Sequence, residues 1–258
     1  MIGRVRSIAF NTFREAVRDR VLYNLIVFAV LLIGSALVLG QISIGIEKIV
    51  LVNLGLTAIS IFGVVIAIFI GIGLVSKEID KKTLYTVLAR PVRRWEFIVG
   101  KFAGLVGTLT VNAGLMALGF FAALLIEQHK YLRTDVHLLT ALYFILLEFV
   151  IVTAVALLFS SFSTPLFSTI FSFALFAAGN FGDDLRGFAA TTHGLTKWAV
   201  TAAAYLVPNL STFNVISLVA HDQPVMGRLI LLNTAYALCY SALAVAGSVM
   251  IFDRRNLK

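Results

Sequence analysis

Charged residues are scarce in this chain and are gathered in a few short segments. Only 13% of the 258 residues are charged, whereas 60% are hydrophobic. A soluble globule of this length needs more polar surface than such a composition supplies, so that class is excluded. The scarcity of charge therefore indicates an integral membrane protein, whose long uncharged runs are helices that cross the bilayer.

Cysteine and catalytic motifs are also nearly absent. The single cysteine, Cys239, excludes an intramolecular disulfide, and its place in an apolar run predicts a buried residue. The sequence contains no H-E-x-x-H, no G-x-S-x-G and no paired acidic motif in an apolar run, which argues against an intramembrane enzyme.

An ATP site is excluded in the same way. The phosphate-binding pattern G-x-x-x-x-G-K-[ST] does not occur: before Gly100-Lys101, Trp95 stands at the place of the first glycine, and Phe102 follows the lysine. We therefore expect no enzymatic activity, no resident cofactor and no ATP binding in this chain.

The uncharged runs predict an all-α membrane protein with six spans. A bilayer core of about 30 Å requires roughly 20 helical residues, and six runs approach or exceed this length. Residues 1–258 then form one transmembrane domain, in which the expected spans are 21–46, 49–75, 102–126, 138–160, 165–181 and 229–252. We expect Pro165 to begin the fifth span. The mixed segment 182–228, in which Asp183 and Asp184 are expected to form a solvated turn, predicts short extracytoplasmic helices that cap the pathway as a gate.

Residues 1–20 predict a helix of another kind. Polar residues recur at Arg4, Ser7, Asn11, Arg14 and Arg18, and apolar residues fill the opposite side. This period is typical of an amphipathic helix that lies in the headgroup layer, where arginines contact anionic lipid.

The basic residues predict the orientation. With a cytoplasmic N-terminus, 15 of the 21 lysines and arginines fall in cytoplasmic segments, namely the first 20 residues, residues 76–101 and the C-terminal tail. The positive-inside rule then places both termini in the cytoplasm of a multi-pass protein of the bacterial inner membrane. The net charge of +8 is thus a topology signal, and it gives no reason to expect a nucleic acid partner.

The most charged interruption of the first half is Ser76–Lys101. Ser76 is expected to be an N-cap, with a helix from about Lys77 to Ala89 that ends before Pro91. A second helical turn from Arg94 to Lys101 would lead into the third span. One interpretation is a solvated basic loop that fixes topology, and the other is a docking element, since Ile79, Leu84, Val87 and Leu88 give the helix an apolar side.

Residues 78–101 contain one further local pattern, E-x-x-x-x-T-L, L-x-x-P-V-x-R and G-K. It is formed by Glu78, Thr83, Leu84, Leu88, Pro91, Val92, Arg94, Gly100 and Lys101. This pattern and the layout of the chain resemble the permeases of ABC-2 type ABC transporters, including those similar to the nitrous oxide reductase maturation permease. One departure is Lys82, where members of the family commonly have glycine.

The resemblance implies a permease without its own ATPase. Residues 76–101 would form a coupling helix that docks on a separate ATPase subunit, present in two copies and binding ATP and Mg. The implied contact residues are Glu78, Ile79, Thr83, Leu84, Val87, Leu88, Pro91 and Arg94. Further implied partners are a second permease chain, identical or related, membrane lipid and a periplasmic protein, and the implied function is export or transmission to that protein.

Glu148 is the one acidic residue near the middle of a predicted span. A charge at such a depth costs about 2.5–3.5 kcal/mol on insertion scales, so the side chain needs a cavity or a partner. It is either a substrate or proton contact in the pathway or a hydrogen-bonded link between helices. A secondary transporter or channel, and a membrane anchor of an ABC-like assembly complex, are therefore alternatives to the permease.

Two weaker patterns complete the sequence. Gly100, Gly104 and Gly107 form a small-residue stripe that allows close approach of a neighbouring backbone. The four histidines at positions 129, 137, 193 and 221 lie in the expected outer segments, but none is paired at i, i+4 and no cysteine accompanies them. We therefore expect no metal site.

Overall fold

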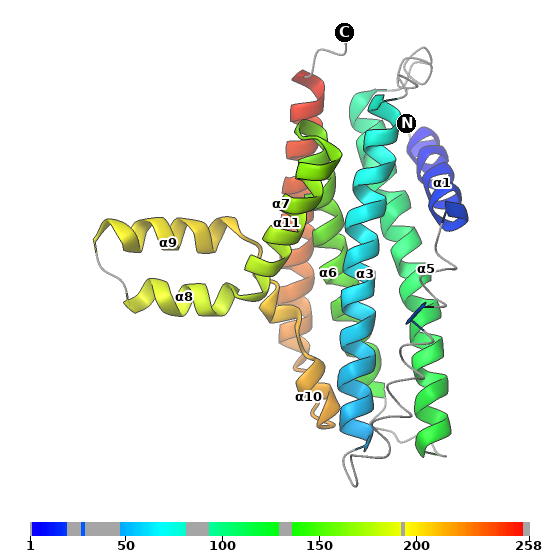
Figure 1. The fold of residues 1–258 in the computed structure, drawn as a ribbon, viewed down its shortest axis with the longest axis vertical. Coiled ribbons are helices and arrows are strands. Elements are labelled where there is room, and N and C mark those ends of the chain that lie inside the picture. Colours follow the sequence, from blue (N-terminus) through cyan, green and yellow to red (C-terminus); the bar gives the residue numbers. More distant parts are fainter. Residues whose placement is uncertain are drawn as a thin grey trace.

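The computed structural model describes residues 2–19, 27–28, 47–80, 93–128, 136–191 and 194–254, and its elements there are helices without strands. Four long helices stand side by side as a bundle (Figure 1). The elements are α1 (Ile2–Asp19), α3 (Glu47–Asp80), α5 (Arg94–Gln128), α6 (Val136–Phe162), α7 (Pro165–Asn180), α8 (Gly182–Thr191), α9 (Leu195–Leu206), η2 (Ser211–Phe213), α10 (Ile216–Ala220) and α11 (Gly227–Arg254).

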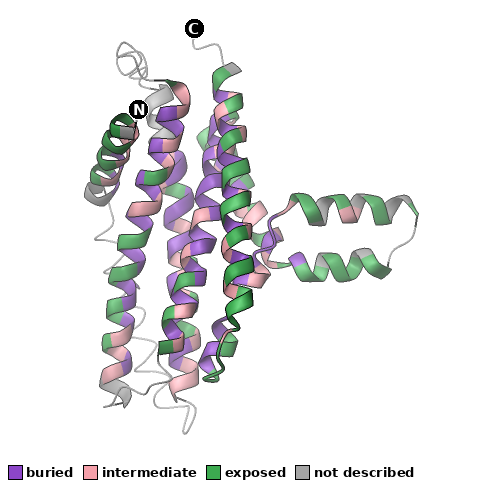
Figure 2. Ribbon diagram, turned by 180° about the vertical axis from the view of Figure 1, so that it is seen from behind, coloured by how far each residue is buried: buried purple, intermediate pink, exposed green. Residues whose placement is uncertain are grey.

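The central helix of the bundle is α6. It packs against α3, α5, α7 and α11, and most of its residues are buried (Figure 2). A helix that is apolar on all sides must be covered on all sides, and α6 has apolar residues around its whole circumference. The other long helices each leave one face exposed, as expected for side chains that face lipid.

The helices long and apolar enough to cross a membrane agree with much of the predicted layout. Within the described residues there are four, Lys48–Gly73, Arg94–Leu125, Val136–Phe162 and Gly227–Asp253, or five if α7 and α8 together form one bent span. The four overlap the predicted spans 49–75, 102–126, 138–160 and 229–252, and the bent pair overlaps 165–181. The remaining one, 21–46, lies outside the described residues except for 27–28, where Phe28 is buried with its ring centroid 6.1 Å from that of Phe62 in α3.

The prediction of an N-cap at Ser76 is wrong. The second predicted span and the following segment form one uninterrupted helix, α3, which continues through Ser76 to Asp80. Serine tolerates a helix interior when the backbone hydrogen bonds continue on both sides, so no boundary is needed there. The rest of the expected 77–89 helix lies outside the described residues from position 81 onward.

The amphipathic N-terminal helix is confirmed as α1, and its apolar side packs on the first turns of α5. The glycine stripe makes this contact close. A side chain at Gly104 would meet the carbonyl oxygen of Ala9 and the side chain of Thr12, and one at Gly100 would meet Ile8. The predicted close backbone approach is therefore confirmed at these two glycines.

Between α7 and α11 the chain leaves the bundle. The axes of α7 and α8 differ by 63°, and α8 and α9 project from the bundle as a pair of short antiparallel helices (Figure 1). The expectation of short helices in 182–228 is confirmed, and Pro165 is the first residue of α7.

Two smaller expectations are wrong. Asp183 and Asp184 are exposed as expected, but they lie in the first turn of the helix α8 and not in a loop, and the Asp183 carboxylate accepts hydrogen bonds from Asn209 (3.2 Å) and Ser211 (2.8 Å). Cys239 is exposed rather than buried, because it lies on a face of α11 that no other part of the described chain covers.

Replacing Gly104 by alanine should loosen α1. The added Cβ would lie 2.5 Å from the Ala9 oxygen and 2.6 Å from Thr12 Cβ, and such overpacking costs about 1–3 kcal/mol. We expect a lower thermal unfolding temperature in detergent and faster tryptic cleavage at the arginines of α1. Gly119→Ala is the matched control on the same helix, since nothing lies within 4 Å of its added Cβ. Equal behaviour of the two variants would contradict the close α1–α5 contact.

Candidate functional site

The segments that the sequence predicts to take part in coupling lie at one end of the bundle. The last residue of α3, the first residue of α5, the helix α1 and the chain's C-terminal end all lie toward this end (Figure 1). We call the contact between α1, residues 93–101 and the last turn of α11 the α1–α5–α11 junction. It borders the segment 81–92, which lies outside the described residues.

The first turn of α5 carries its own cap. Glu96 is buried, and its Oε2 accepts a hydrogen bond from the backbone N–H of Arg93 at 3.0 Å. A glutamate at the third helical position that reaches back to the residue before the helix satisfies a donor that the helix leaves unpaired. Glu96 therefore fixes the point at which the chain enters α5, and the sequence reading did not single it out.

Arg94 joins α5 to α11. Its Nη1 donates to the backbone carbonyls of Phe252 (2.9 Å) and Asp253 (3.1 Å) in the last turn of α11. These carbonyls belong to the turn of the helix whose acceptors lack partners within it. The rings of Phe97 and Phe252 stack beside this contact with centroids 6.0 Å apart, so the two helix ends are held by both polar and apolar contacts.

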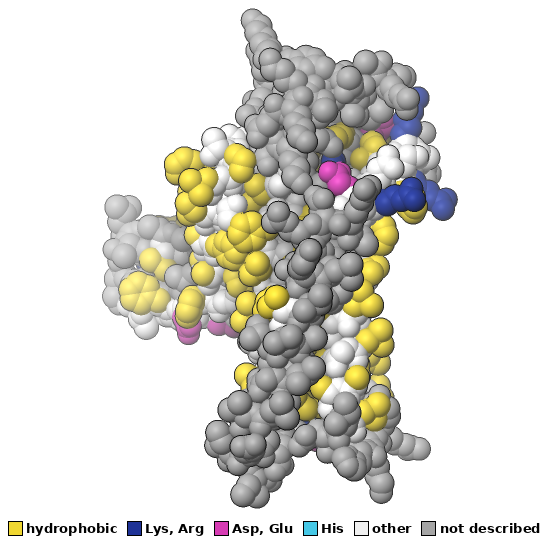
Figure 3. All heavy atoms as spheres, turned by 45° about the vertical axis from the view of Figure 1, so that its right-hand side comes forward, with side chains coloured by type: hydrophobic (Ala, Val, Ile, Leu, Met, Phe, Trp, Pro, Cys, Tyr) yellow, Lys and Arg dark blue, Asp and Glu magenta, His cyan; other side chains and the backbone are white. Residues whose placement is uncertain are grey.

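Lys101 joins α5 to α1. The side chain is buried, with Nζ 4.0 Å from Glu15 Oε2 on α1 and 5.6 Å from the centre of the Phe97 ring. A lysine removed from water requires such a carboxylate or aromatic partner. Lysine and arginine side chains are visible near the same end of the molecule in Figure 3.

The predicted coupling residues fall on both sides of the undescribed segment. Glu78 and Ile79 lie in the last turns of α3, and Arg94 is the first residue of α5. The others, Thr83, Leu84, Val87, Leu88 and Pro91, lie outside the described residues. Arg94 makes the intramolecular contacts described above, and Gly100 and Lys101 of the local pattern face α1.

Glu148 lies in the middle of α6 and is only 6% exposed. Its Oε2 accepts a hydrogen bond of 2.8 Å from Ser60 Oγ of α3. Within the part of the chain that the structure describes, Ser60 is the one side chain that donates to this carboxylate. The contact links two central helices, as the structural interpretation of Glu148 requires, but it occupies only one of the two carboxylate oxygens.

Glu148 also lines a cavity of about 320 Å³, which we call the Glu148 pocket. Its walls come from α3, α6, α7 and the turn around η2. The buried Glu148 lies at its floor, whereas exposed residues such as Ile61, Ala177 and Phe181 surround the opening. The pocket thus leads from the bundle surface, between α3 and α7, to a carboxylate.

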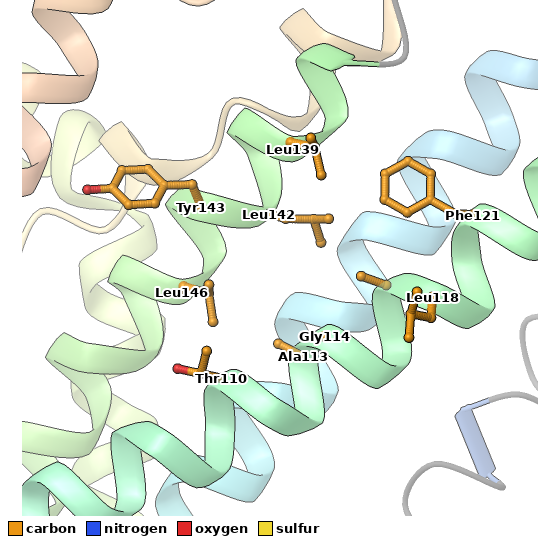
Figure 4. Close-up of a pocket in the computed structure, with 10 residues that line it drawn as sticks. Thr110, Ala113, Gly114, Leu118, Phe121, Leu139, Leu142, Tyr143 and Leu146 are labelled. Carbon is orange, nitrogen blue, oxygen red and sulfur yellow. The ribbon is translucent and has the colours of Figure 1, made fainter. Parts of the chain in front are cut away.

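A second cavity of about 400 Å³ lies between α5 and α6 (Figure 4). Its lining is apolar apart from the hydroxyls of Thr110 and Tyr143. Tyr143 points away from the cavity in Figure 4, and its hydroxyl lies 2.8 Å from that of Thr234 on α11. With no charged side chain in its lining, this cavity has no means of directing a polar ligand.

Metal chemistry has no support in the described ranges. No group of three or more histidines, cysteines, aspartates or glutamates is close enough there to hold an ion. His137 and His221 belong to these ranges, whereas His129 and His193 lie outside them.

Comparison with known proteins identifies the family of this chain. The model of a family described as "ABC-2 family transporter protein" matches residues 6–256, nearly the whole chain. A search of curated protein sequences finds no match.

Replacing Arg94 by alanine should release the end of α11. Loss of hydrogen bonds from a charged donor costs about 1.5–3 kcal/mol, which corresponds to roughly ten- to hundredfold faster opening. Amide hydrogen exchange in the last turn of α11 measures this effect. Arg93→Ala is the control, because that side chain is exposed and only its backbone N–H contacts Glu96. Unchanged exchange in Arg94→Ala would refute the anchoring role.

The Ser60–Glu148 contact can be tested by a double-mutant cycle. Glu148→Gln still accepts the Ser60 hydrogen bond, so we expect its unfolding free energy to stay within about 1 kcal/mol of wild type, whereas Glu148→Ala should lose about 1–3 kcal/mol. Unfolding in detergent provides the measurement. The effects of Ser60→Ala and Glu148→Ala should be less than additive in the double variant, and strict additivity would exclude a direct interaction.

Proposed function

Because this chain belongs to the ABC-2 family of transporter proteins, we propose that it is a permease subunit that couples ATP hydrolysis on a separate subunit to transport across the membrane. Members of the family usually work with an ABC ATPase subunit. The observation that supports the coupling step best is the placement of the 81–93 segment directly between two long membrane helices, with no intervening domain.

The helices on both sides of this segment suggest how force would be transmitted. α3 continues without interruption from the membrane to Asp80, and α5 starts at Arg94 with a capped first turn. Helices transmit displacement along their axes because their backbone hydrogen bonds make them stiff. Movement of an ATPase docked on 76–101 would therefore reach the central helix α6, against which both α3 and α5 pack.

The junction would distribute the same movement further. Arg94 holds the end of α11, and the Gly100–Gly104 surface together with Lys101 holds α1. Docking residues in the undescribed part of the segment, Leu84 among them, would contact the ATPase and move with it. In this proposal Arg94 transmits the load within the permease rather than contacting the ATPase directly.

The remaining features of the transporter belong to the same proposal. The basic end of the bundle faces the cytoplasm of a bacterial inner membrane, two permease chains face each other, and two ATPase subunits supply ATP and Mg. Residues 21–46 would form the first of six spans, and 182–228 would cap the outer end as a gate. The direction is export, or transmission to a periplasmic protein as in permeases similar to the nitrous oxide reductase maturation permease.

One observation favours a second candidate, a secondary transporter. A buried carboxylate at the floor of an open pocket in a membrane bundle is typical of ion- or proton-coupled transport. Such a protein would move its substrate without an ATPase, so dependence of transport on ATP separates the two candidates.

Coexpression with the ABC ATPase encoded nearest to this chain's gene tests the main proposal. We expect the two proteins to copurify, and we expect Leu84→Asp to reduce the retained ATPase at least about tenfold, because a carboxylate replaces an apolar docking side chain. Glu78→Ala should reduce ATP-dependent transport while the permease keeps its unfolding temperature. Retention is measured by quantitative immunoblotting after gentle extraction.

The matched control is Leu118→Asp, a leucine on the exposed lipid-side surface of α5 far along the chain from the coupling segment. It is expected to affect insertion but not the amount of ATPase retained per folded permease. Transport and ATPase retention that remain unaltered in both the Glu78 and Leu84 variants would contradict coupling through this segment.

A further inference from the structure

The lining of the Glu148 pocket contains an acidic side chain but no basic one. Its floor carries one carboxylate, and none of its lining residues, all of them within the described ranges, is lysine, arginine or histidine. Ser60 contacts only Oε2 of that carboxylate. A group that enters the pocket therefore meets one acidic side chain with a free acceptor oxygen and no compensating cation in the lining.

Because the surroundings of Glu148 are apolar, the negative charge of its carboxylate strongly affects which ligands can bind in the pocket. Electrostatic attraction strengthens as water is excluded, and Glu148 is 94% removed from solvent. An anionic ligand is excluded by repulsion, and a purely apolar ligand would leave the carboxylate without a partner. A neutral donor can form a hydrogen bond to the carboxylate, but a cation gains most from the floor of the pocket, because its charge is opposite to that of the carboxylate.

The walls favour a cation with an apolar body. Phe176 and Phe213 present aromatic rings, and Ile145 and Ile216 present aliphatic side chains to the same space. Aromatic rings attract organic cations through their faces, and aliphatic walls bury hydrocarbon. A hydrated metal ion would use neither, and no cluster of three metal-ligating side chains is present among the described residues.

The volume of the pocket limits the size of the ligand, and its opening determines how the ligand enters. A cavity of about 320 Å³ is in the range of small-molecule sites. Its rim includes the polar side chains of Thr57 and Asn214, which are exposed, so a charged headgroup is not forced through an entirely apolar opening. The lining thus combines exposed polar side chains, apolar side chains and one buried carboxylate.

We propose that the Glu148 pocket binds an organic ammonium ion that carries an aromatic or aliphatic body, with the ammonium group against Glu148. Binding itself does not depend on the transport function. Interpreting the bound ion as the cargo does rest on the proposed permease function, and it names amphipathic cations as the substrate class.

The test uses the full chain in lipid nanodiscs without any ATPase. The probe is benzyltrimethylammonium, and the comparison ligand is 2-methyl-1-phenylpropan-2-ol, a neutral molecule of nearly the same shape. Ligand-observed saturation-transfer NMR measures binding, with empty nanodiscs subtracted. We expect the cation to bind wild type and to lose at least about tenfold in affinity in Glu148→Gln, while the alcohol binds both proteins alike.

Two further variants locate the site. Asp184→Asn removes an exposed carboxylate on α8 and should leave binding unchanged. Ala177→Trp fills the opening from an exposed position on α7 and should abolish binding of both ligands. The proposal is overturned if the cation fails to bind wild type, if Glu148→Gln binds it as well as wild type, or if Ala177→Trp leaves its affinity intact. None of these outcomes bears on ATPase docking, which the Leu84 variant tests separately.

Discussion

The burial of α6 on every side is the constraint on which the rest of the bundle depends. This helix is apolar around its whole circumference and has four long or medium helices packed against it. Close approach is achieved where glycine faces an aromatic ring: a side chain at Gly63 of α3 would overlap the Phe149 ring of α6. Without its neighbours α6 would place its polar atoms, above all Glu148, directly in lipid.

Several polar groups inside the bundle form hydrogen bonds to other protein atoms, so lipid does not have to solvate them. Thr153 Oγ1 donates to the carbonyl of Phe149 one turn earlier at 2.7 Å, and the hydroxyls of Ser161 and Ser248 contact each other between α6 and α11. In a membrane such hydrogen bonds contribute modestly, but an unpaired polar group is costly. Glu148 differs from these groups, because it accepts a hydrogen bond from Ser60 through Oε2 alone and also lines a cavity.

The α1–α5–α11 junction gives physical reasons for part of the pattern that the sequence shares with ABC-2 permeases. Gly100 is small because α1 lies against it, Lys101 contacts α1 through Glu15, and Arg94 supplies donors to the end of α11. These residues bind the permease together at the place where the coupling segment joins it. The apolar residues of that segment remain the proposed surface for the ATPase.

The sequence by itself determined the class, the helical architecture and the position of most spans, because long uncharged runs have few alternatives in a bilayer. It also predicted the amphipathic face of α1, the glycine stripe and the start of α7 at Pro165, all of which depend on local spacing. It misplaced the boundary at Ser76, because a serine permits a cap but does not require one, and the continuous helix α3 satisfies the backbone there.

Only the tertiary structure decided which residues meet. Ser60 and Glu148 are 88 positions apart, and Arg94 and Phe252 are 158 apart, so no local pattern could pair them. The exposure of Cys239 and the contacts of Asp183 have the same origin, since each depends on which helix face the rest of the chain covers. The charge of Glu148 could be read from the sequence, but the pocket that gives this charge a possible ligand exists only where α3, α6, α7 and η2 come together.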